Sequence, residues 1–149
     1  MFISTPKFGE ARRREPMSEL TLDEARRVAS AAEAKALELG CAVTITVTDA
    51  GGHVRAQTRL DGARFGTLNV SANKAFTATA FGVPTKILTG LTQPGQDLFG
   101  FDDAAGGRIA IFAGGMPLLR DEEIVGAIGI SGGSVDQDQG IADAGAAAL

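Results

Sequence analysis

The sequence of 149 residues contains no tryptophan or tyrosine, one cysteine (Cys41) and one histidine (His53). One cysteine excludes an internal disulfide, and a single Cys with a single His is too few for a structural zinc site. Lys and Arg number 14 against 18 Asp and Glu, giving a formal charge of −4. No expected face concentrates the basic residues, so nucleic acid is not expected as a partner.

Long hydrophobic runs are also missing. No stretch reaches the length that crosses a bilayer, and the N-terminus lacks the apolar segment of a signal peptide. We therefore expect a cytoplasmic protein with no membrane partner. Residues 1–16 have neither helical nor strand periodicity, which predicts a disordered tail before a single domain over residues 17–149. With only 5% aromatic residues, the core of that domain must consist of small aliphatic side chains.

The first half of the domain predicts a helix and a β-hairpin. Thr21 and Glu24 have the spacing of a capping box, and small apolar residues recur at helical spacing until Gly40. Residues 41–48 alternate strictly between Val or Ile and Thr, which predicts a half-buried strand with the threonines on its open face. A turn over residues 49–52 leads into a second alternating run over 54–60, so the two strands form an antiparallel hairpin.

The second half begins with a helical pattern over residues 65–81. Its expected buried stripe comprises Phe65, Leu68, Ala72, Phe76 and Ala80, with Asn73, Lys74 and Thr77 away from the centre. The remaining expected elements are a short helix over 84–89, a long loop over 90–107, strands over 108–112, 117–120 and 124–131, and a final helix over 135–149. Ala127 and Gly129 give the last strand a small face against which a helix can pack closely. This order predicts an α+β fold with an antiparallel sheet.

Common motifs for nucleotides and for serine nucleophiles are absent. The sequence contains no Gly-x-Gly-x-x-Gly, Walker or Gly-x-Ser-x-Gly pattern. The run Gly129 to Gly133 precedes the final helix, so its amides could cradle an anion at the helix start. The alternative is a plain strand-to-helix connection with Ser134 as N-cap.

Five motifs in order resemble the GlcG/HbpS haem-binding-protein family, to which the C-terminal domain of PduO-type proteins is related. They are Asp49-Ala50-Gly51-Gly52-His53-Val54, Leu60-Asp61-Gly62-Ala63, Asn73-Lys74-Ala75, Gly114-Gly115-Met116-Pro117, and residues 125–133 followed by Asp138. The resemblance covers residues 20–149. It implies a profilin-like five-stranded antiparallel sheet flanked by helices, a homo-oligomer, and haem or a related tetrapyrrole as ligand in some members. The chain departs from the family in having Asp121-Glu122-Glu123 where a glycine is common, and Met116 where Val or Ile is frequent.

Haem binding needs an apolar slot, an axial donor and cations near the propionates. The available donors are His53, Met116 and Lys74, with His53 as the candidate metal ligand and Gly114 and Gly115 as further pocket residues. The propionates could meet Arg55 and Arg59, which the alternation places on the same strand face as His53. The alternatives are that His53 is a solvated turn residue, that Met116 fills the core, and that the two arginines lie on a solvated face.

Two other functions remain open. A cofactor-independent enzyme acting on a small carboxylated metabolite could use Lys74 as base or Schiff-base amine, with His53 and Asp49 as further catalytic candidates. Alternatively, Lys74 bridges to Asp49 or Asp61, while Asp49 binds the amides of its own turn. The third possibility is an oligomeric accessory protein of a catabolic pathway. The leading prediction is a protein that binds haem in a pocket bounded by the first hairpin, the helix of Lys74 and the Gly114-Gly115 loop.

Overall fold

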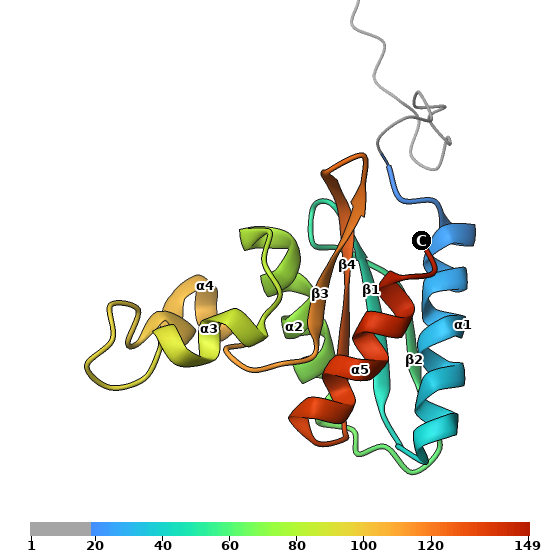
Figure 1. The fold of residues 1–149 in the computed structure, drawn as a ribbon, viewed down its shortest axis with the longest axis horizontal. Coiled ribbons are helices and arrows are strands. Elements are labelled where there is room, and N and C mark those ends of the chain that lie inside the picture. The colour runs from blue at the N-terminus through green and yellow to red at the C-terminus, as the bar shows by residue number, and fades with distance from the viewer. Residues whose placement is uncertain (1–18) are drawn as a thin grey trace, which may run out of the picture.

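One antiparallel sheet of four strands organises the chain (Figure 1). The computed structural model describes residues 19–149, so the expected disordered tail over residues 1–16 lies outside the described part. The strands are β1 (Thr44–Asp49), β2 (Val54–Arg59), β3 (Gly115–Arg120) and β4 (Glu123–Ser131), in the spatial order β2-β1-β4-β3. The expected α+β class with an antiparallel sheet is therefore confirmed.

Helices cover both faces of this sheet (Figure 1). The helices α1 (Leu22–Leu39) and α5 (Val135–Ala146) pack together on one face, and α2 (Thr67–Phe81) packs on the other. The main hydrophobic core lies between the sheet and the α1/α5 pair and consists of Val, Ile, Leu and Ala side chains. Within residues 19–149, no helix combines the length and the hydropathy needed to cross a membrane.

The expected start and end of α1 are confirmed. Thr21 accepts a hydrogen bond from the Glu24 amide, and the Glu24 carboxylate accepts one from the Thr21 amide, as in a capping box. Gly40 follows the helix with φ +64°, a left-handed conformation that glycine adopts at little cost.

The expectation of a half-buried β1 is wrong, because both faces of the strand are covered. The three threonines Thr44, Thr46 and Thr48 are at most 1% exposed. Their hydroxyl groups share hydrogen bonds of 2.7, 2.7 and 3.0 Å with hydroxyl groups of Thr67, Ser71 and Thr79 on α2. Because α2 supplies a polar partner for each threonine, a polar strand face can be buried without leaving a hydrogen bond unmade.

The expected buried stripe of α2 is also wrong. Phe65 precedes the helix and is 80% exposed, whereas the buried residues are Ser71, Lys74, Ala75, Thr77, Ala78 and Thr79. These small or polar side chains let the helix approach β4 so closely that a Cβ atom on Gly129 would overlap the Ser71 carbonyl. Close packing against Gly129 was expected and is confirmed.

The fifth strand does not form, so the profilin-like, five-stranded detail is wrong in strand number. Residues 108–112 are irregular because their backbone binds side chains of neighbouring helices. The Ala110 amide donates to the Thr77 hydroxyl (2.9 Å), and the Ile111 carbonyl accepts from the Thr89 hydroxyl (2.7 Å). Before this segment, α3 (Lys86–Leu91), the 3-10 helix η1 (Phe101–Asp103) and α4 (Ala104–Gly107) project from the body as an arm, residues 86–107 (Figure 1).

Candidate functional site

The β1–β2 hairpin is organised by Asp49. Its Oδ1 atom accepts hydrogen bonds from the amides of Gly51 (2.9 Å) and His53 (3.0 Å), so Asp49 binds the amides of its own turn as expected. Gly52 has φ +79°, which the tight turn requires and which glycine permits. The hairpin therefore holds His53 in a defined position at the start of β2.

The imidazole of His53 is available for ligand binding. Its side chain is 83% exposed, and its Nδ1 atom lies 3.5 Å from Asp49 Oδ1. Metal-binding histidines commonly direct one ring nitrogen to a carboxylate and use the other as ligand. With Nδ1 beside Asp49, Nε2 is the nitrogen free to bind an incoming group.

The hairpin meets α2 at Phe76. A Cβ atom on Gly52 would lie 3.1 Å from the Phe76 ring, and the Arg108 guanidinium lies 3.7 Å from that ring's centroid. Arg55 lies at an irregularity of β2, because Val54 pairs with Thr48 and Ala56 with Val47, which leaves Arg55 without a partner residue on β1. Its Nε atom is buried and has no hydrogen-bond partner. No other buried side-chain nitrogen or oxygen of residues 19–149 lacks one. We call Asp49, His53, Arg55, Phe76 and Arg108 the hairpin cluster.

Lys74 belongs to a different, buried cluster. Its side chain is 1% exposed, and Nζ donates to the Ile130 carbonyl (2.7 Å) and to Asp138 Oδ2 (2.9 Å). The ring of Phe112 covers the ammonium at 4.8 Å from its centroid. The other carboxylate oxygen of Asp138 accepts from the Gly133 amide at 2.8 Å. We call this set the lysine cluster.

The electrostatics of Lys74 follow from its burial. Desolvation lowers the pKa of the Lys74 ammonium, while the hydrogen bond and the charge of Asp138 act in the opposite direction. A buried ammonium group is tolerated only with such a partner. The expected bridge from Lys74 to Asp49 or Asp61 is wrong, because the partner is Asp138 from α5.

Gly114 makes room for the lysine side chain, and Gly115 makes room for the backbone of α2 at Lys74. A Cβ atom on Gly114 would lie 2.8 Å from Lys74 Nζ and 2.7 Å from the Ile130 carbonyl. A Cβ atom on Gly115 would lie 2.6 Å from the Lys74 carbonyl. The structure thus brings Gly114, Gly115 and Lys74 together.

The structure separates Lys74 from His53 and from Met116. On β4, the partner of Asp49 is Gly126, whereas Lys74 binds Ile130, four residues further on and about 13 Å along the strand. Met116 pairs with Ile128 and packs against the main core, on the face of α1 and α5. The residues expected to line one pocket therefore lie in distinct parts of the fold.

Several site residues escaped the sequence analysis. The sequence analysis names Asp138 only as part of a family motif, places Phe76 in a buried stripe and places Arg108 in a strand. The position of Asp138 within a family motif was the one available signal. Contacts between segments as distant as 74 and 138 leave no periodic pattern.

The connection from β4 to α5 follows the plainer of its two interpretations. Ser134 caps α5, and it forms a capping box with Gln137. The Gly133 amide binds Asp138 and the Ser134 amide binds Gln137. These two amides are therefore occupied by side chains of the protein itself.

Together these features define a small α+β protein with an exposed imidazole beside a sheet and a buried lysine–aspartate pair. The chain belongs to the HbpS-like family, whose model, described as "Haem degrading protein HbpS-like", matches residues 20–147.

Three relatives illustrate the similarity. An uncharacterized 15.0 kDa protein from the dhaT-dhaS intergenic region of Citrobacter freundii is 40% identical over 83% of this chain and 87% of its own length. The corrinoid adenosyltransferase PduO of the same organism is 37% identical over 91% of this chain, which spans only 41% of that enzyme. The crystal structure of a PduOC:heme complex is 34% identical, with a TM-score of 0.84 and coverage of 88% of this chain and 95% of that chain.

Proposed function

We propose that this protein binds haem or a related tetrapyrrole, with His53 as the iron ligand. The observation that carries the proposal is the exposed imidazole of His53, whose Nδ1 lies beside Asp49 while Nε2 is free. The similarity to a protein crystallised as a heme complex supports the same ligand class.

The hairpin cluster also contains groups suited to the rest of a tetrapyrrole. Phe76 provides an aromatic surface, and Arg108 lies against it with a cationic group that can pair with a propionate. Arg55 Nε, buried without a partner, is a second donor that a carboxylate would satisfy. Bound haem would supply an iron centre, and these residues would fix its position and orient the histidine.

Met116 and Lys74 are weaker candidates for iron ligation. The thioether of Met116 packs against the main core, so it would have to leave that core to reach an iron atom. The Lys74 ammonium is 1% exposed and already engaged by Asp138 and Ile130. The same contacts weaken the case for Lys74 as a catalytic amine acting with His53 and Asp49.

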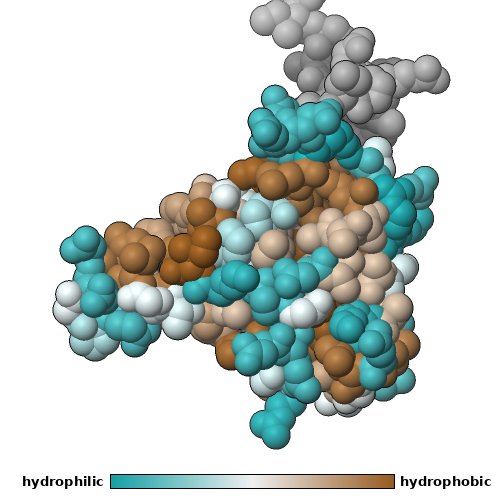
Figure 2. Space-filling model, in the orientation of Figure 1, coloured by the Kyte–Doolittle hydropathy of each residue, from teal (hydrophilic) through white to brown (hydrophobic). Residues whose placement is uncertain are grey.

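Self-association is a further part of this proposal. Large apolar side chains are exposed along the arm, namely Ile87, Leu91, Leu98 and Phe99. Figure 2 shows the apolar surface that gathers over this arm. A surface of this kind, projecting from the body, is suited to contact with a second copy of the chain. Light scattering of the wild type and of Phe99→Glu tests it, since a monomeric wild type would exclude the contact.

Haemin titration with the Soret band as readout tests the haem proposal. Wild type should bind haemin saturably and stoichiometrically, and His53→Ala should lose the spectrum of the coordinated iron. Two control variants should retain that spectrum. They are Met116→Ala and Arg26→Gln, and Arg26 lies on the exposed surface of α1. An unaltered spectrum in His53→Ala would reject His53 as ligand, and no saturable binding by wild type would reject haem as the ligand.

A further inference from the structure

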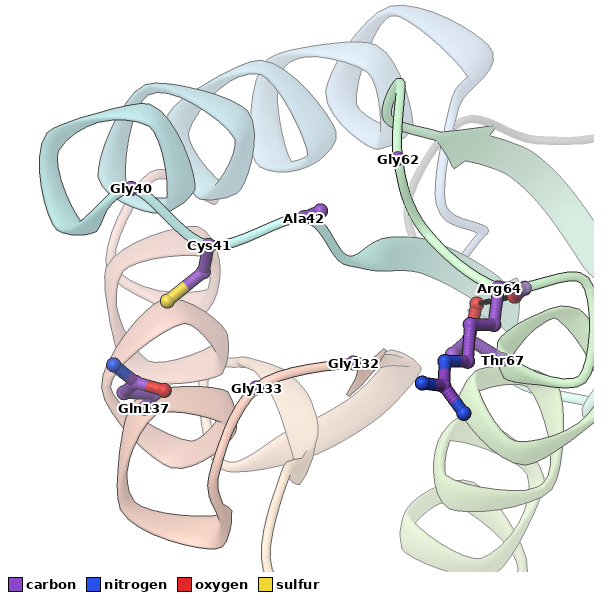
Figure 3. Close-up of a pocket in the computed structure, with 9 residues that line it drawn as sticks. All are labelled: Gly40, Cys41, Ala42, Gly62, Arg64, Thr67, Gly132, Gly133 and Gln137. Carbon is purple, nitrogen blue, oxygen red and sulfur yellow. Dashed lines mark hydrogen bonds between the residues drawn. The ribbon is translucent and has the colours of Figure 1, made fainter.

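A cavity lies at the end of the sheet opposite the β1–β2 hairpin (Figure 3). It has a volume of about 310 Å³ and lies between the α1–β1 connection, the β2–α2 connection and the β4–α5 connection. Its lining residues are Gly40, Cys41, Ala42, Gly62, Arg64, Thr67, Gly132, Gly133 and Gln137. This volume is at the lower end of the range for small-molecule sites, so the cavity suits a ligand much smaller than a tetrapyrrole.

Charge in this cavity has one sign. Arg64 is the only ionised side chain among the lining residues, and none of them carries a carboxylate. Figure 3 shows its guanidinium group extending from the start of α2 toward the Gly132–Gly133 loop. Within residues 19–149, no carboxylate forms an ion pair with Arg64. The guanidinium is therefore free to bind an anion.

The other polar groups on the wall leave recognition to Arg64. Gln137 uses its Oε1 atom to accept from the Ser134 amide, which leaves its NH₂ group as an unused donor. Thr67 is satisfied, because its hydroxyl binds the Arg64 carbonyl and the Thr44 hydroxyl. In Figure 3 that NH₂ group points away from Gly133 and Arg64, so the free polar group that reaches the cavity is the Arg64 guanidinium.

Two nearby carboxylates lie outside this cavity. Asp61 lines a neighbouring pocket that shares Gly40, Cys41 and Ala42 with it. Asp138 lies behind Gly133 and binds its amide, but it is paired with Lys74. The pair neutralises that carboxylate, and Arg64 is the one charged side chain that lines the cavity itself. Because the Gly133 and Ser134 amides at the start of α5 are occupied, Arg64 would carry the recognition rather than the helix terminus.

We propose that this cavity binds a small oxyanion ligand, a carboxylate or a phosphate, through the Arg64 guanidinium. The site is separate from the hairpin cluster, so it would add a second ligand to a haem-binding protein. It does not depend on haem being bound.

Cys41 supplies a direct probe, because it lines the cavity and is the only cysteine of the chain. Iodoacetamide alkylates a cysteine when the thiolate sulfur attacks the CH₂ carbon and iodide leaves. Mass spectrometry then follows the rate at one site. A ligand in the cavity should shield Cys41 from this uncharged reagent.

The experiment measures the alkylation rate of the full chain, without haemin, against increasing malonate or inorganic phosphate at constant ionic strength. We expect saturable protection of at least about threefold, with Kd on the order of 1 mM or tighter for the preferred anion. Arg64→Gln should lose the protection, and Arg26→Gln should retain it. Malonate and phosphate distinguish the carboxylate from the phosphate class.

Equal protection in Arg64→Gln, or none with either anion, would overturn the proposal. If Cys41 reacts too slowly to follow, the same titrations are read from the backbone amide NMR signals of Gly132 and Gly133. Saturable shifts in wild type that vanish in Arg64→Gln support the site, and unchanged signals reject it. Since haemin is absent throughout, failure here leaves the haem proposal to its own test.

Discussion

Replacing Lys74 by methionine should destabilise the protein by about 3–5 kcal/mol. Methionine keeps an unbranched side chain of similar length, so the change removes the ammonium with little change in packing volume. It leaves the Asp138 carboxylate, whose side chain is 4% exposed, with the Gly133 amide as its remaining hydrogen-bond donor. It also deprives the buried Ile130 carbonyl of a donor at 2.7 Å.

This magnitude is large for a domain of such size. The free energy of unfolding of small proteins is about 5–15 kcal/mol, so the loss would take about a fifth of it or more. Urea denaturation at pH 7, followed by circular dichroism, measures the difference directly. The Lys74→Met/Asp138→Leu double variant should recover much of the loss, because no buried charge remains unpaired.

The pH dependence provides a second measurement. Because burial lowers the pKa of Lys74 below its ordinary value of 10.5, the unfolded chain binds more protons than the native one between the two values. Stability rises with pH wherever the unfolded state binds more protons, so the wild-type free energy of unfolding should gain a positive slope in this window. Lys74→Met should lack this contribution. A loss below about 1 kcal/mol, with no difference in slope, would refute the assignment of a buried charge pair.

Three further variants test local features of the fold by urea denaturation. Glu122→Gly should stabilise by about 1 kcal/mol, because Glu122 has φ +69° in the β3–β4 turn; no gain would contradict this strain. Glu24→Gln should cost about 1 kcal/mol at pH 7, since hydrogen bonding to Thr21 and the charge of Arg120 lower the pKa of Glu24. The wild-type advantage should be complete above pH 4.5 and disappear as pH falls through the lowered value, and a pH-independent cost would exclude ionisation as its cause. Gly129→Ala should cost about 3 kcal/mol, because its Cβ would overlap an α2 carbonyl, and a neutral effect would show that α2 can shift.

Local signals in the sequence predicted the elements whose cause is itself local. The capping box at Thr21 and Glu24, the turn at Asp49 and the cap at Ser134 each depend on residues within a few positions, and each is confirmed. The family was predicted from motifs in order, and the antiparallel sheet from the order of the expected helices and strands. The prediction of a fifth strand is wrong because the backbone of residues 108–112 forms hydrogen bonds with helix side chains. A short apolar run does not reveal these partners.

Burial on the α2 side could not be predicted from alternation. The threonines of β1 have the pattern of a solvated face. That face is buried because each threonine hydroxyl has a hydrogen-bond partner on α2. The same holds for Lys74, which a helical pattern places off the apolar stripe although it is 1% exposed. A periodic pattern shows which side chains are polar. Polar side chains are exposed only where no buried hydrogen-bond partner faces them from another element.

The helix α2 connects the two clusters, and this explains why a buried charge pair is useful far from the exposed histidine. Lys74 and Phe76 are two residues apart, about 200° around the helix, so one faces the lysine cluster while the other meets the hairpin. The Lys74–Asp138 pair, supported by the Ile130 carbonyl, fixes the position of α2 relative to β4 and α5. The position of Phe76 beneath the Gly52 turn depends on that placement. Loosening the lysine cluster should therefore alter the hairpin cluster, although Lys74 itself binds no ligand there.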